Sequence, residues 1–377
     1  MAILSMWPKL SRCFSYTSSR DWVYRQFFSM MGLRSVATNF GDGTIMHCWV
    51  PKIHHPCKPT LVLVHGFGAN AMWQFGEHLR PFVTHFNVYV PDLLFFGNSF
   101  SSRPERTEKF QAQCLMKLME SQGVHRMMLV GISYGGFVGY SLAAQFPEAV
   151  ERVVLCCTGV CLEENDMKSG LFKVSTLDEA ASILLPQTPD KLRLLMRMSF
   201  VKPARGVPSF FLADFIDVMC SKYVEQKKEL IESILKDRQL SLLPKITQPT
   251  LIVWGEQDQI FPLELGYRLK EHIGENAQIV VIKNAGHAVN LEKTREFERH
   301  LKSFLIDTES CTPSSQLTLI EQIQKKFDFT ENWSGWGVLA WCGLLLLLVT
   351  VFEYQLSVMV TMFCYLSTKF LVESDVT

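Results

Sequence analysis

The stretch VGISYGG, residues 130–136, decides the fold of this sequence. It holds Ser133 between Gly131 and Gly135, after an apolar run, RMMLV, and before a helical pattern of small residues, FVGYSLAAQF. A G-x-S-x-G pattern where a strand gives way to a helix is typical of a strained turn that exposes the serine hydroxyl. Glycine leaves room for such a turn because it carries no side chain to clash. The pattern therefore predicts that Ser133 is a nucleophile rather than a spacer in an ordinary turn.

A serine hydroxyl becomes a useful nucleophile only when a base takes its proton and hydrogen-bond donors stabilise the oxyanion that forms. One donor is expected to be the backbone N–H of Tyr134, the residue after the serine. The other is expected from the segment HGFG, residues 65–68, which follows the apolar run TLVLV. Its glycines allow close backbone approach, so the N–H of Phe67 is the second candidate, although HGFG can also be read as a simple turn.

An acid and a histidine are expected later in the chain, in that order. The apolar runs TLIVWG and QIVVIK are followed by EQD and NAGH, which offer Asp258 and His287. Both groups follow expected strands, and the carboxyl ends of parallel strands gather ligands at one edge of a sheet. Glu256 competes with Asp258 for the acid role, and His65 competes with His287 but suits the oxyanion loop better. The sequence therefore predicts a triad of Ser133, Asp258 and His287.

Short β-like runs alternate with helical patterns over most of the chain, which indicates a mainly parallel sheet covered by helices. The first two runs, VATNF and IMHCWV, are separated by Gly-Asp-Gly and are expected to form an antiparallel hairpin. Four helical patterns interrupt the alternation at about 162–243, before it resumes with TLIVWG. The sequence therefore predicts one α/β domain at 36–307 with an inserted helical cap.

The segments on either side of this domain differ from it in composition. Residues 1–35 are expected to form an amphipathic segment lying on the domain, with a transit peptide as the alternative. Residues 308–332 form a polar linker, and residues 333–352 read WSGWGVLAWCGLLLLLVTVF. An uncharged helix of this length spans about 30 Å, which predicts a transmembrane helix. The tail, residues 353–377, holds a second hydrophobic segment at 354–368 that is a candidate for another crossing.

Composition excludes one class of partner and disfavours a metal site. The 37 basic residues equal the 37 acidic residues, and no basic run is interleaved with aromatics, so nucleic acid is not an expected partner. Cys156, Cys157 and Cys161 lack the C-x-x-C spacing and the histidine partners of a zinc site, which favours packing over metal binding. Neither a metal nor a cofactor is therefore expected.

The same residues give an expected location for the chain. Its eleven cysteines show no paired spacing, which indicates a reducing compartment. Lys325 and Lys326 precede the predicted membrane helix, and the positive-inside preference then places the catalytic domain in the cytosol. We expect a single-pass membrane protein, with the endoplasmic reticulum as the favoured organelle.

These motifs, together with PDLLFFGNS at 91–99, resemble the α/β-hydrolase superfamily over about residues 36–305. The branch is the one that holds meta-cleavage-product hydrolases, epoxide hydrolases and monoacylglycerol-lipase-like membrane hydrolases, and the pattern looks closest to plant members of the last kind. The resemblance implies an α/β-hydrolase fold with a mostly parallel eight-stranded sheet and a helical cap. It also implies that Ser133, Asp258 and His287 form the triad.

The resemblance also implies roles for other residues and disfavours some members of the superfamily. Phe67 and Tyr134 would lend backbone N–H groups to the oxyanion, and Asp92 in the PDL segment looks structural. A serine at position 133 argues against epoxide hydrolases and dehalogenases of this fold, which use an aspartate. The segment HAVNLE ends in Glu292, whereas some acyltransferase relatives carry H-x-x-x-x-D, and this weakens an acyltransferase reading.

The predicted function is hydrolysis of carboxylic esters by a membrane-anchored serine hydrolase. A lipid-like substrate, monoacylglycerol or a related acyl ester, would suit an apolar cap and a membrane tail. Candidate pocket residues in the cap are Phe200, Phe210, Phe211, Phe215 and Met219. One alternative is a ligand-sensing receptor that retains the triad, as plant hormone receptors of this fold do. Another is a C–C bond hydrolase, which would need polar groups in the cap.

Overall fold

The computed structural model describes residues 15–174 and 176–306 of the 377-residue chain. Within these residues the strands form one sheet in the order β1-β2-β4-β3-β6-β7-β8-β9, with β5 beside β2. The pairs β1–β2 and β2–β4 are antiparallel, and all pairs from β4 to β9 are parallel. The strands are β1 (Leu33–Asn39), β2 (Thr44–Pro51), β3 (Thr60–Val64), β4 (Asn87–Pro91), β5 (Phe100–Ser101), β6 (Met127–Ile132), β7 (Val150–Cys156), β8 (Thr250–Gly255) and β9 (Ala277–Ile282).

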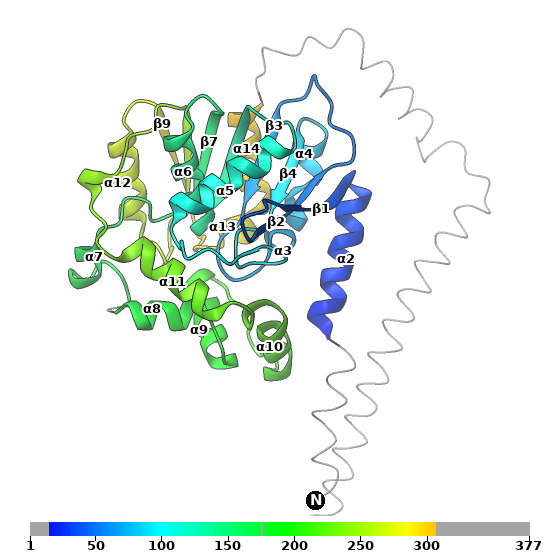
Figure 1. The fold of residues 1–377 in the computed structure, drawn as a ribbon. Coiled ribbons are helices and arrows are strands. Elements are labelled where there is room, and N and C mark those ends of the chain that lie inside the picture. Colours follow the sequence, from blue (N-terminus) through cyan, green and yellow to red (C-terminus); the bar gives the residue numbers. More distant parts are fainter. Residues whose placement is uncertain (1–14, 175, 307–377) are drawn as a thin grey trace, which may run out of the picture. The chain divides into compact units, whose positions relative to one another are not determined.

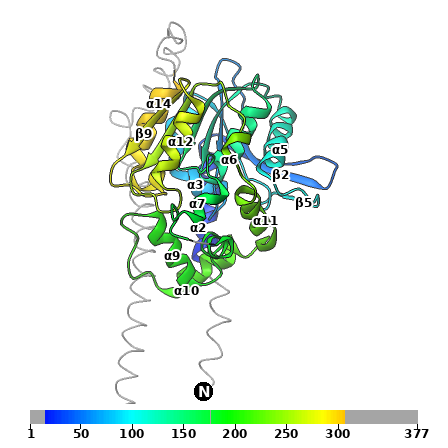
Figure 2. The same cartoon turned by 90° about the vertical axis from the view of Figure 1, so that its left-hand side faces the viewer.

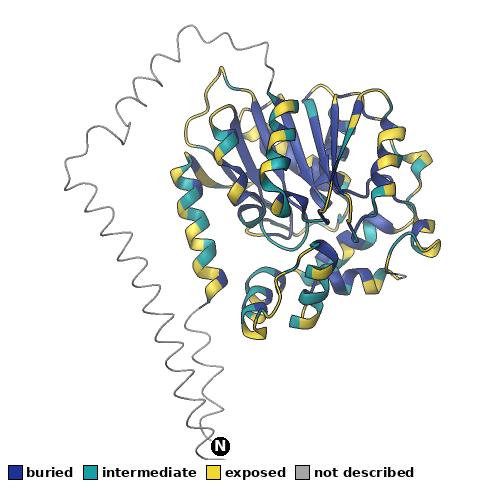
Figure 3. Cartoon of the chain, turned by 180° about the vertical axis from the view of Figure 1, so that it is seen from behind, coloured by how far each residue is buried: buried dark blue, intermediate teal, exposed yellow. Residues whose placement is uncertain are grey.

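The central strands are continuous apolar runs because helices cover both faces of the sheet. Every residue of β3, β4, β6 and β8 is buried, and Figure 3 shows these strands in dark blue beneath helices with exposed outer faces. The prediction of an α/β domain with a mostly parallel sheet is confirmed. The predicted hairpin is also confirmed, since Asn39 pairs with Ile45 across the Gly-Asp-Gly turn.

The sheet has one strand more than the eight that were predicted. The additional strand, β5, consists of Phe100 and Ser101 and pairs with Thr44 and Ile45 of β2. A strand of two residues is too short to produce a detectable alternation of apolar and polar residues, so its absence from the prediction has a simple physical reason.

Helices lie on both faces of the sheet. Figures 1 and 2 show α5 and α6 together on one face and α14 on the opposite face. Several of these helices begin at a polar cap; for example, the Thr107 side chain accepts a hydrogen bond from the N–H of Phe110 at the start of α5. The helices outside the cap are α2 (Tyr16–Met30), α3 (Ala71–Phe75), η2 (Gly76–His78), α4 (Arg80–Val83), α5 (Glu108–Ser121), α6 (Tyr134–Gln145), α12 (Leu263–Ile273), α13 (Val289–Glu292) and α14 (Thr294–Leu305).

A group of mostly short helices separates β7 from β8 in the chain. Figure 1 shows them gathered below the sheet, in green. Two of them begin at a threonine, a residue that commonly caps helices: the side chains of Thr176 and Thr188 accept backbone N–H hydrogen bonds at the starts of α8 and α9. The elements of this cap are α7 (Glu164–Lys168), α8 (Leu177–Leu184), α9 (Pro189–Ser199), α10 (Ser209–Phe215), η3 (Ile216–Cys220), α11 (Val224–Leu235) and η4 (Leu240–Leu242).

The N-terminal helix α2 contacts both the cap and the sheet. The backbone N–H of Thr17 donates to the Asp214 carboxylate of α10 at 2.8 Å, and the rings of Tyr16 and Phe211 meet edge-to-face at 5.5 Å. At the other end of the helix, Phe28 is fully buried and lies 5.1 Å from the Trp49 ring of β2. The helix is therefore packed into the domain along its length.

In the part of the chain that the structure describes, no helix is long and apolar enough to cross a membrane. The linker at 308–332, the predicted transmembrane helix at 333–352 and the tail at 353–377 lie outside the described residues, as do residues 1–14. The membrane helix therefore stays a prediction.

Asp92, at the end of β4, is buried in a network of hydrogen bonds. Its carboxylate accepts from Nδ1 of His47 at 2.8 Å and from the backbone N–H groups of Ala71 at 3.1 Å and Asn98 at 3.3 Å. Burial, the largest single effect, would raise the pKa of Asp92, but the interactions with His47 and His65 and the hydrogen bond from Ala71 together hold the pKa below its ordinary value. These contacts tie β2, β4 and α3 together and agree with a structural role.

The backbone of Gly97 passes so close to Asp92 that a side chain there would collide with it. Gly97 has φ +52°, and a Cβ atom would lie 2.1 Å from Oδ2 of Asp92. Gly41 has a comparable φ of +78° but has open space around its Cβ position. We predict that Gly41→Ala costs about 1 kcal/mol in the free energy of unfolding, from backbone strain alone.

Gly97→Ala should cost clearly more, roughly 3 kcal/mol or above, because it also breaks the Asp92 network. Urea denaturation of the two variants beside the parent chain measures the difference. Equal losses in the two variants would show that the network around Asp92 contributes nothing beyond backbone strain.

Candidate active site

Ser133 lies at the sharp turn between β6 and α6. Its backbone has φ 53° and ψ −120°, a left-handed conformation that non-glycine residues rarely adopt and that costs of order 1–3 kcal/mol. Two hydrogen bonds hold the turn: the Ser133 N–H donates to the carbonyl of Cys156 in β7 at 2.8 Å, and its carbonyl accepts from Gly136 at 2.9 Å. The neighbouring strand therefore supports the strained residue that the sequence motif predicted.

The glycines of the motif are needed because backbones meet there at very short range. A Cβ atom on Gly131 would lie 2.4 Å from the carbonyl oxygen of Gly135. One on Gly135 would lie 2.2 Å from the carbonyl oxygen of Val64, and one on Gly66 would lie 2.8 Å from Cβ of Ser133. No side chain fits in these gaps, so the glycines bring β3, β6 and the HGFG loop together around the serine.

The structure brings Ser133, His287 and Asp258 into one hydrogen-bonded chain. Nε2 of His287 lies 2.9 Å from Oγ of Ser133, and Nδ1 lies 2.9 Å from Oδ2 of Asp258. With Asp258 ionised, Nδ1–H donates to the carboxylate and Nε2 accepts the serine hydroxyl proton. This is the arrangement in which a histidine can act as a base toward the serine.

Asp258 is held in place by the backbone that follows it. Its side chain is fully buried, and Oδ1 accepts from the N–H groups of Ile260 at 2.8 Å and Phe261 at 2.9 Å. The competing acid, Glu256, is exposed, and its carboxylate accepts from the N–H of Asn284 at 3.1 Å instead of reaching His287. Of the two carboxylates that the sequence offered, Asp258 is the one that meets the histidine.

His65, the competing histidine, takes part in the oxyanion loop and does not reach Ser133. It is fully buried; its Nε2 accepts from the backbone N–H of Leu93 at 3.0 Å, so its Nδ1 carries the proton and donates to the Gly66 carbonyl at 2.7 Å. Burial, the largest effect, lowers the pKa of His65 and favours this neutral form.

The two candidate oxyanion donors, Phe67 and Tyr134, belong to the HGFG loop and to the start of α6. Tyr134 is the first residue of α6, so its N–H has no acceptor within the helix. The rings of Phe67 and Tyr134 pack edge-to-face at 4.9 Å, which places the HGFG loop against the start of α6. The loop is further held by Gln74 of α3, whose side-chain oxygen accepts from the N–H of Gly66. Gln74 was not singled out from the sequence, because no local pattern links it to the loop.

Glu292 is a second residue that the sequence analysis did not recognise in this role. Its Oε2 accepts from the N–H of Gly286 at 2.7 Å, directly before His287. Its Oε1 accepts from the N–H groups of Val201 at 2.9 Å and Lys202 at 3.3 Å, just after α9 of the cap. One carboxylate therefore joins the histidine loop to the cap. The spacing in HAVNLE is the signal that could have drawn attention to it.

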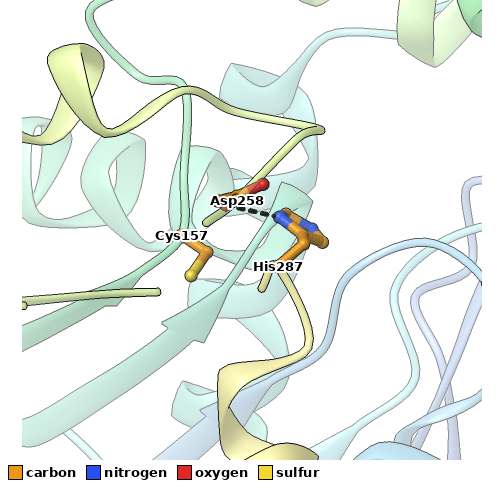
Figure 4. A group of neighbouring side chains, drawn as sticks. All are labelled: Cys157, Asp258 and His287. Carbon is orange, nitrogen blue, oxygen red and sulfur yellow. Dashed lines mark hydrogen bonds and ion pairs between the residues drawn. The ribbon is translucent and has the colours of Figure 1, made fainter. Parts of the chain in front are cut away.

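Cys157 lies beside the acid and the histidine, and Figure 4 shows the three side chains together. Candidate ligand atoms of Cys157, Asp258 and His287 all lie within 4.8 Å of one another, as they would in a metal site. However, Nδ1 of His287 is already bonded to Asp258. Burial also raises the pKa of the Cys157 thiol well above its ordinary value, whereas metals bind the thiolate. The group fits a hydrogen-bonded pair with a packed thiol better than a metal centre.

Ser133 and His287 open onto a cavity of about 410 Å³. Of the five cap residues considered from the sequence, Phe200, Phe211 and Phe215 line this cavity. Phe210 and Met219 do not line it: Phe210 is exposed to solvent, and Met219 packs against the apolar cap cluster that contributes Leu192 and Leu212 to the cavity wall. The other apolar lining side chains include Trp73, Leu184, Leu192, Leu195, Met196, Val207, Leu212 and Leu291.

Comparisons with known proteins agree with this architecture. Residues 59–294 match the family described as alpha/beta hydrolase fold. The chain is 28% identical over 271 residues to monoacylglycerol lipase ABHD6 of Bos taurus, covering 69% of this chain and 79% of that protein. It is 29% identical over 262 residues to 2-hydroxy-6-oxo-2,4-heptadienoate hydrolase of Pseudomonas putida, covering 65% of this chain and 88% of that protein.

A solved structure extends the comparison to the fold. A membrane phospholipase A, described as a bacterial virulence factor, superposes with a TM-score of 0.62 at 23% identity, covering 81% of this chain and 94% of that one. At that identity the likeness concerns the fold alone. The predicted enzyme class, a hydrolase of the esterase and lipase type, is confirmed, while the roles of individual site residues stay predictions. The chain belongs to the α/β-hydrolase fold family, as the motif around Ser133 predicted.

Proposed function

We propose that this protein is a serine hydrolase that cleaves the carboxylic ester of an acyl lipid, such as a monoacylglycerol. The observation that carries the proposal is the hydrogen-bonded chain of Ser133, His287 and Asp258 opening onto a large apolar cavity. Relatives that include a monoacylglycerol lipase support the same substrate class.

In the proposed reaction, Oγ of Ser133 attacks the ester carbonyl while Nε2 of His287 takes the hydroxyl proton. The N–H groups of Phe67 and Tyr134 stabilise the negative charge on the carbonyl oxygen. His287 then gives its proton to the leaving alcohol, and the acyl group remains on Ser133. Water, deprotonated by His287, attacks this acyl-enzyme and releases the carboxylic acid. Asp258 holds the histidine in the required tautomer throughout.

The lining of the cavity favours an acyl chain as the bound group. Among the cap residues that line it, Ser199 is the one with a polar side chain, and the others are aliphatic or aromatic within the described residues. Burial of each methylene contributes about 0.8 kcal/mol, so an alkyl chain gains affinity along the whole cavity. Polar side chains that line the cavity from outside the cap include Thr17 of α2, Gln74 and Asn290.

The same lining disfavours C–C bond hydrolysis, although one relative is named as an enzyme acting on 2-hydroxy-6-oxo-2,4-heptadienoate. A substrate that carries a carboxylate and an enol needs charged or polar groups to compensate for its desolvation. The cap offers a single hydroxyl, that of Ser199, to this cavity. An uncharged ester with an apolar acyl chain suits it better.

Membrane anchoring by residues 333–352 is part of the proposal and rests on the sequence. The uncharged run is long enough to span a bilayer, and Lys325 and Lys326 precede it. The catalytic domain would then face the cytosol, with the endoplasmic reticulum as the favoured membrane. An anchor of this kind would keep the enzyme close to lipid substrates.

The proposed nucleophile is tested by Ser133→Ala. Loss of the hydroxyl should lower the rate of monoacylglycerol hydrolysis by roughly 10⁴-fold or more, because the acyl-enzyme cannot form. A fluorophosphonate probe should label the parent chain at Ser133 and leave the variant unlabelled. His287→Ala should be about as severe, and the double variant no worse than either single one. Near-normal turnover in Ser133→Ala would refute the mechanism.

The proposed acid is tested by comparing Asp258→Asn with Glu256→Gln. The buried Asp258 carboxylate fixes the tautomer of His287, so its amide variant should lose about two or more orders of magnitude in kcat. Glu256 contacts a backbone N–H at the surface, and its variant should remain close to the parent. Steady-state kinetics on one soluble ester ranks the two. A larger loss in Glu256→Gln would reassign the acid.

The proposed topology is tested on the full-length chain in sealed microsomes. The protein should resist extraction with carbonate, and added protease should digest the catalytic domain because that domain faces outward, toward the cytosol. The sequon Asn332-Trp333-Ser334 should stay unglycosylated. Protection of the catalytic domain from protease would reverse the proposed orientation. Release of the whole chain by carbonate would remove the anchor from the proposal.

A further inference from the structure

A second cavity, of about 140 Å³, has a more polar lining. It lies among α2, the segments after the HGFG loop and after β4, and the part of the cap from η3 to α11. Three basic side chains line it: Arg25 of α2, Lys222, and Lys227 of α11. Two acidic side chains, Asp21 and Asp92, line it as well. We call it the lysine cavity, after Lys222 and Lys227.

Lys227 is the unusual member of this group. It is only 3% exposed, and its Nζ lies 4.9 Å above the centre of the Phe96 ring. Within residues 15–174 and 176–306, its ammonium has neither a hydrogen-bond acceptor nor an ion-pair partner. A cation–π contact offsets part of the cost of burial, but a buried ammonium normally requires an anion or several acceptors.

The two carboxylates of the lysine cavity are already engaged with other donors. Asp21 pairs with Nε of Arg25 at 2.9 Å, and its second oxygen accepts from the side chains of Asn70 at 3.1 Å and Trp73 at 3.3 Å. Asp92 accepts from His47 and from two backbone N–H groups, as described above. Neither carboxylate forms an ion pair with Lys227, so within the described residues its ammonium lines the cavity without a counter-ion.

The charges that line the cavity leave a positive excess. Arg25, Lys222 and Lys227 outnumber Asp21 and Asp92 by one positive charge. Lys222 is exposed and stands at the entrance, where it can meet an incoming anion. Asn98 and Tyr223 also line the cavity and bring neutral hydrogen-bond donors.

We propose that the lysine cavity binds a phosphate group, with Lys227 as its buried anchor and Lys222 at its entrance. A phosphate carries about one and a half to two negative charges at neutral pH and several acceptor oxygens, which match the excess charge and the separated donors. The phosphate is either a free ion or the headgroup of an anionic lipid. The lysine cavity does not contain the serine or its partners, so the binding of phosphate does not depend on the proposed ester hydrolysis, whereas the lipid-headgroup alternative rests on it.

The position of the lysine cavity gives such a phosphate a structural consequence. Ala69, next to the HGFG loop, lines both the lysine cavity and the apolar cavity at Ser133. A phosphate bound by Lys222 and Lys227 of the cap, and by Asn98 of the core, joins these two parts of the domain. It should therefore stabilise the contact between the cap and the core as well as compensate the buried charge.

The test uses the full-length chain in neutral detergent. Inorganic phosphate should raise the melting temperature in a saturable manner above that in chloride of equal ionic strength, and calorimetry should give a dissociation constant. Lys227→Met keeps the apolar stem and removes the charge, and it should weaken phosphate binding by roughly tenfold or more. The control is Lys228→Met, the next residue, which pairs with Asp178 away from the cavity and should bind phosphate like the parent.

Lys222→Gln, at the exposed entrance, is a second variant that should fold in any case and should weaken binding several-fold. A parent chain that phosphate does not stabilise, or equal stabilisation of the parent and Lys227→Met, would overturn the proposal and leave a cavity that holds water only. Equal binding by the parent and Lys222→Gln would contradict the assigned entrance.

A kinetic comparison distinguishes the two sources of phosphate. If the ligand is a lipid headgroup, phosphate should compete with a lysophosphatidic acid substrate but not with a neutral monoacylglycerol, and Lys227→Met should raise KM for the acidic lipid alone. If the ligand is the free ion, phosphate should stabilise the chain without competing with either lipid. Both patterns require the binding measured above. The melting temperature reports on this site even when Ser133→Ala is inactive, so a failure of the ester mechanism would be recognised separately.

Discussion

The strained backbone of Ser133 is the constraint on which the rest of the site depends. A left-handed conformation at a serine persists only when its surroundings hold it, and here the carbonyl of Cys156 in β7 accepts its N–H at 2.8 Å. The pairing of β6 with β7 is therefore part of the catalytic geometry as well as of the core. Gly131 and Gly135 also help to keep Ser133 in this conformation, because any side chain at either position would displace the backbone that it faces. The strands of the sheet therefore fix the position of the Ser133 hydroxyl.

The histidine must meet this hydroxyl from a loop, and that loop is held from two sides. Glu256 fixes it at Asn284, while Glu292 fixes it at Gly286 and at the same time holds the chain just after α9. One carboxylate therefore connects the end of α9 to the residue before His287. The same helix contributes Leu192, Leu195 and Met196 to the apolar cavity, so the cavity wall and the histidine loop share one support.

The parts of this arrangement that could be predicted from the sequence are those with local patterns. Glycine spacing around Ser133, and the order of strand ends before Asp258 and His287, depend on neighbours in the chain, and the structure brings these three residues together. The hydrogen bonds from Val201 and Lys202 to Glu292 span 91 and 90 residues and leave no local pattern. The nearer bonds, from Gly66 to Gln74 and from Gly286 to Glu292, were not assigned because neither belongs to the motif around the serine. In the cap, helical periodicity indicates an apolar face but not which cavity that face meets. The sequence could therefore not separate Phe211, which lines the apolar cavity, from the exposed Phe210.

The helix α2 shows how a segment that looks peripheral in the sequence can complete the site. Its first turn, with Tyr16 and Thr17, lines the apolar cavity, and the next turns, with Asp21 and Arg25, line the lysine cavity. The hydrogen bond from Thr17 to Asp214 fastens this helix to the cap at 2.8 Å. The helix α2 therefore lines both cavities and is also bonded to α10 of the cap. An acyl chain in the first cavity and a phosphate in the second would act on the same helix, so occupation of either one bears on the position of the cap over Ser133.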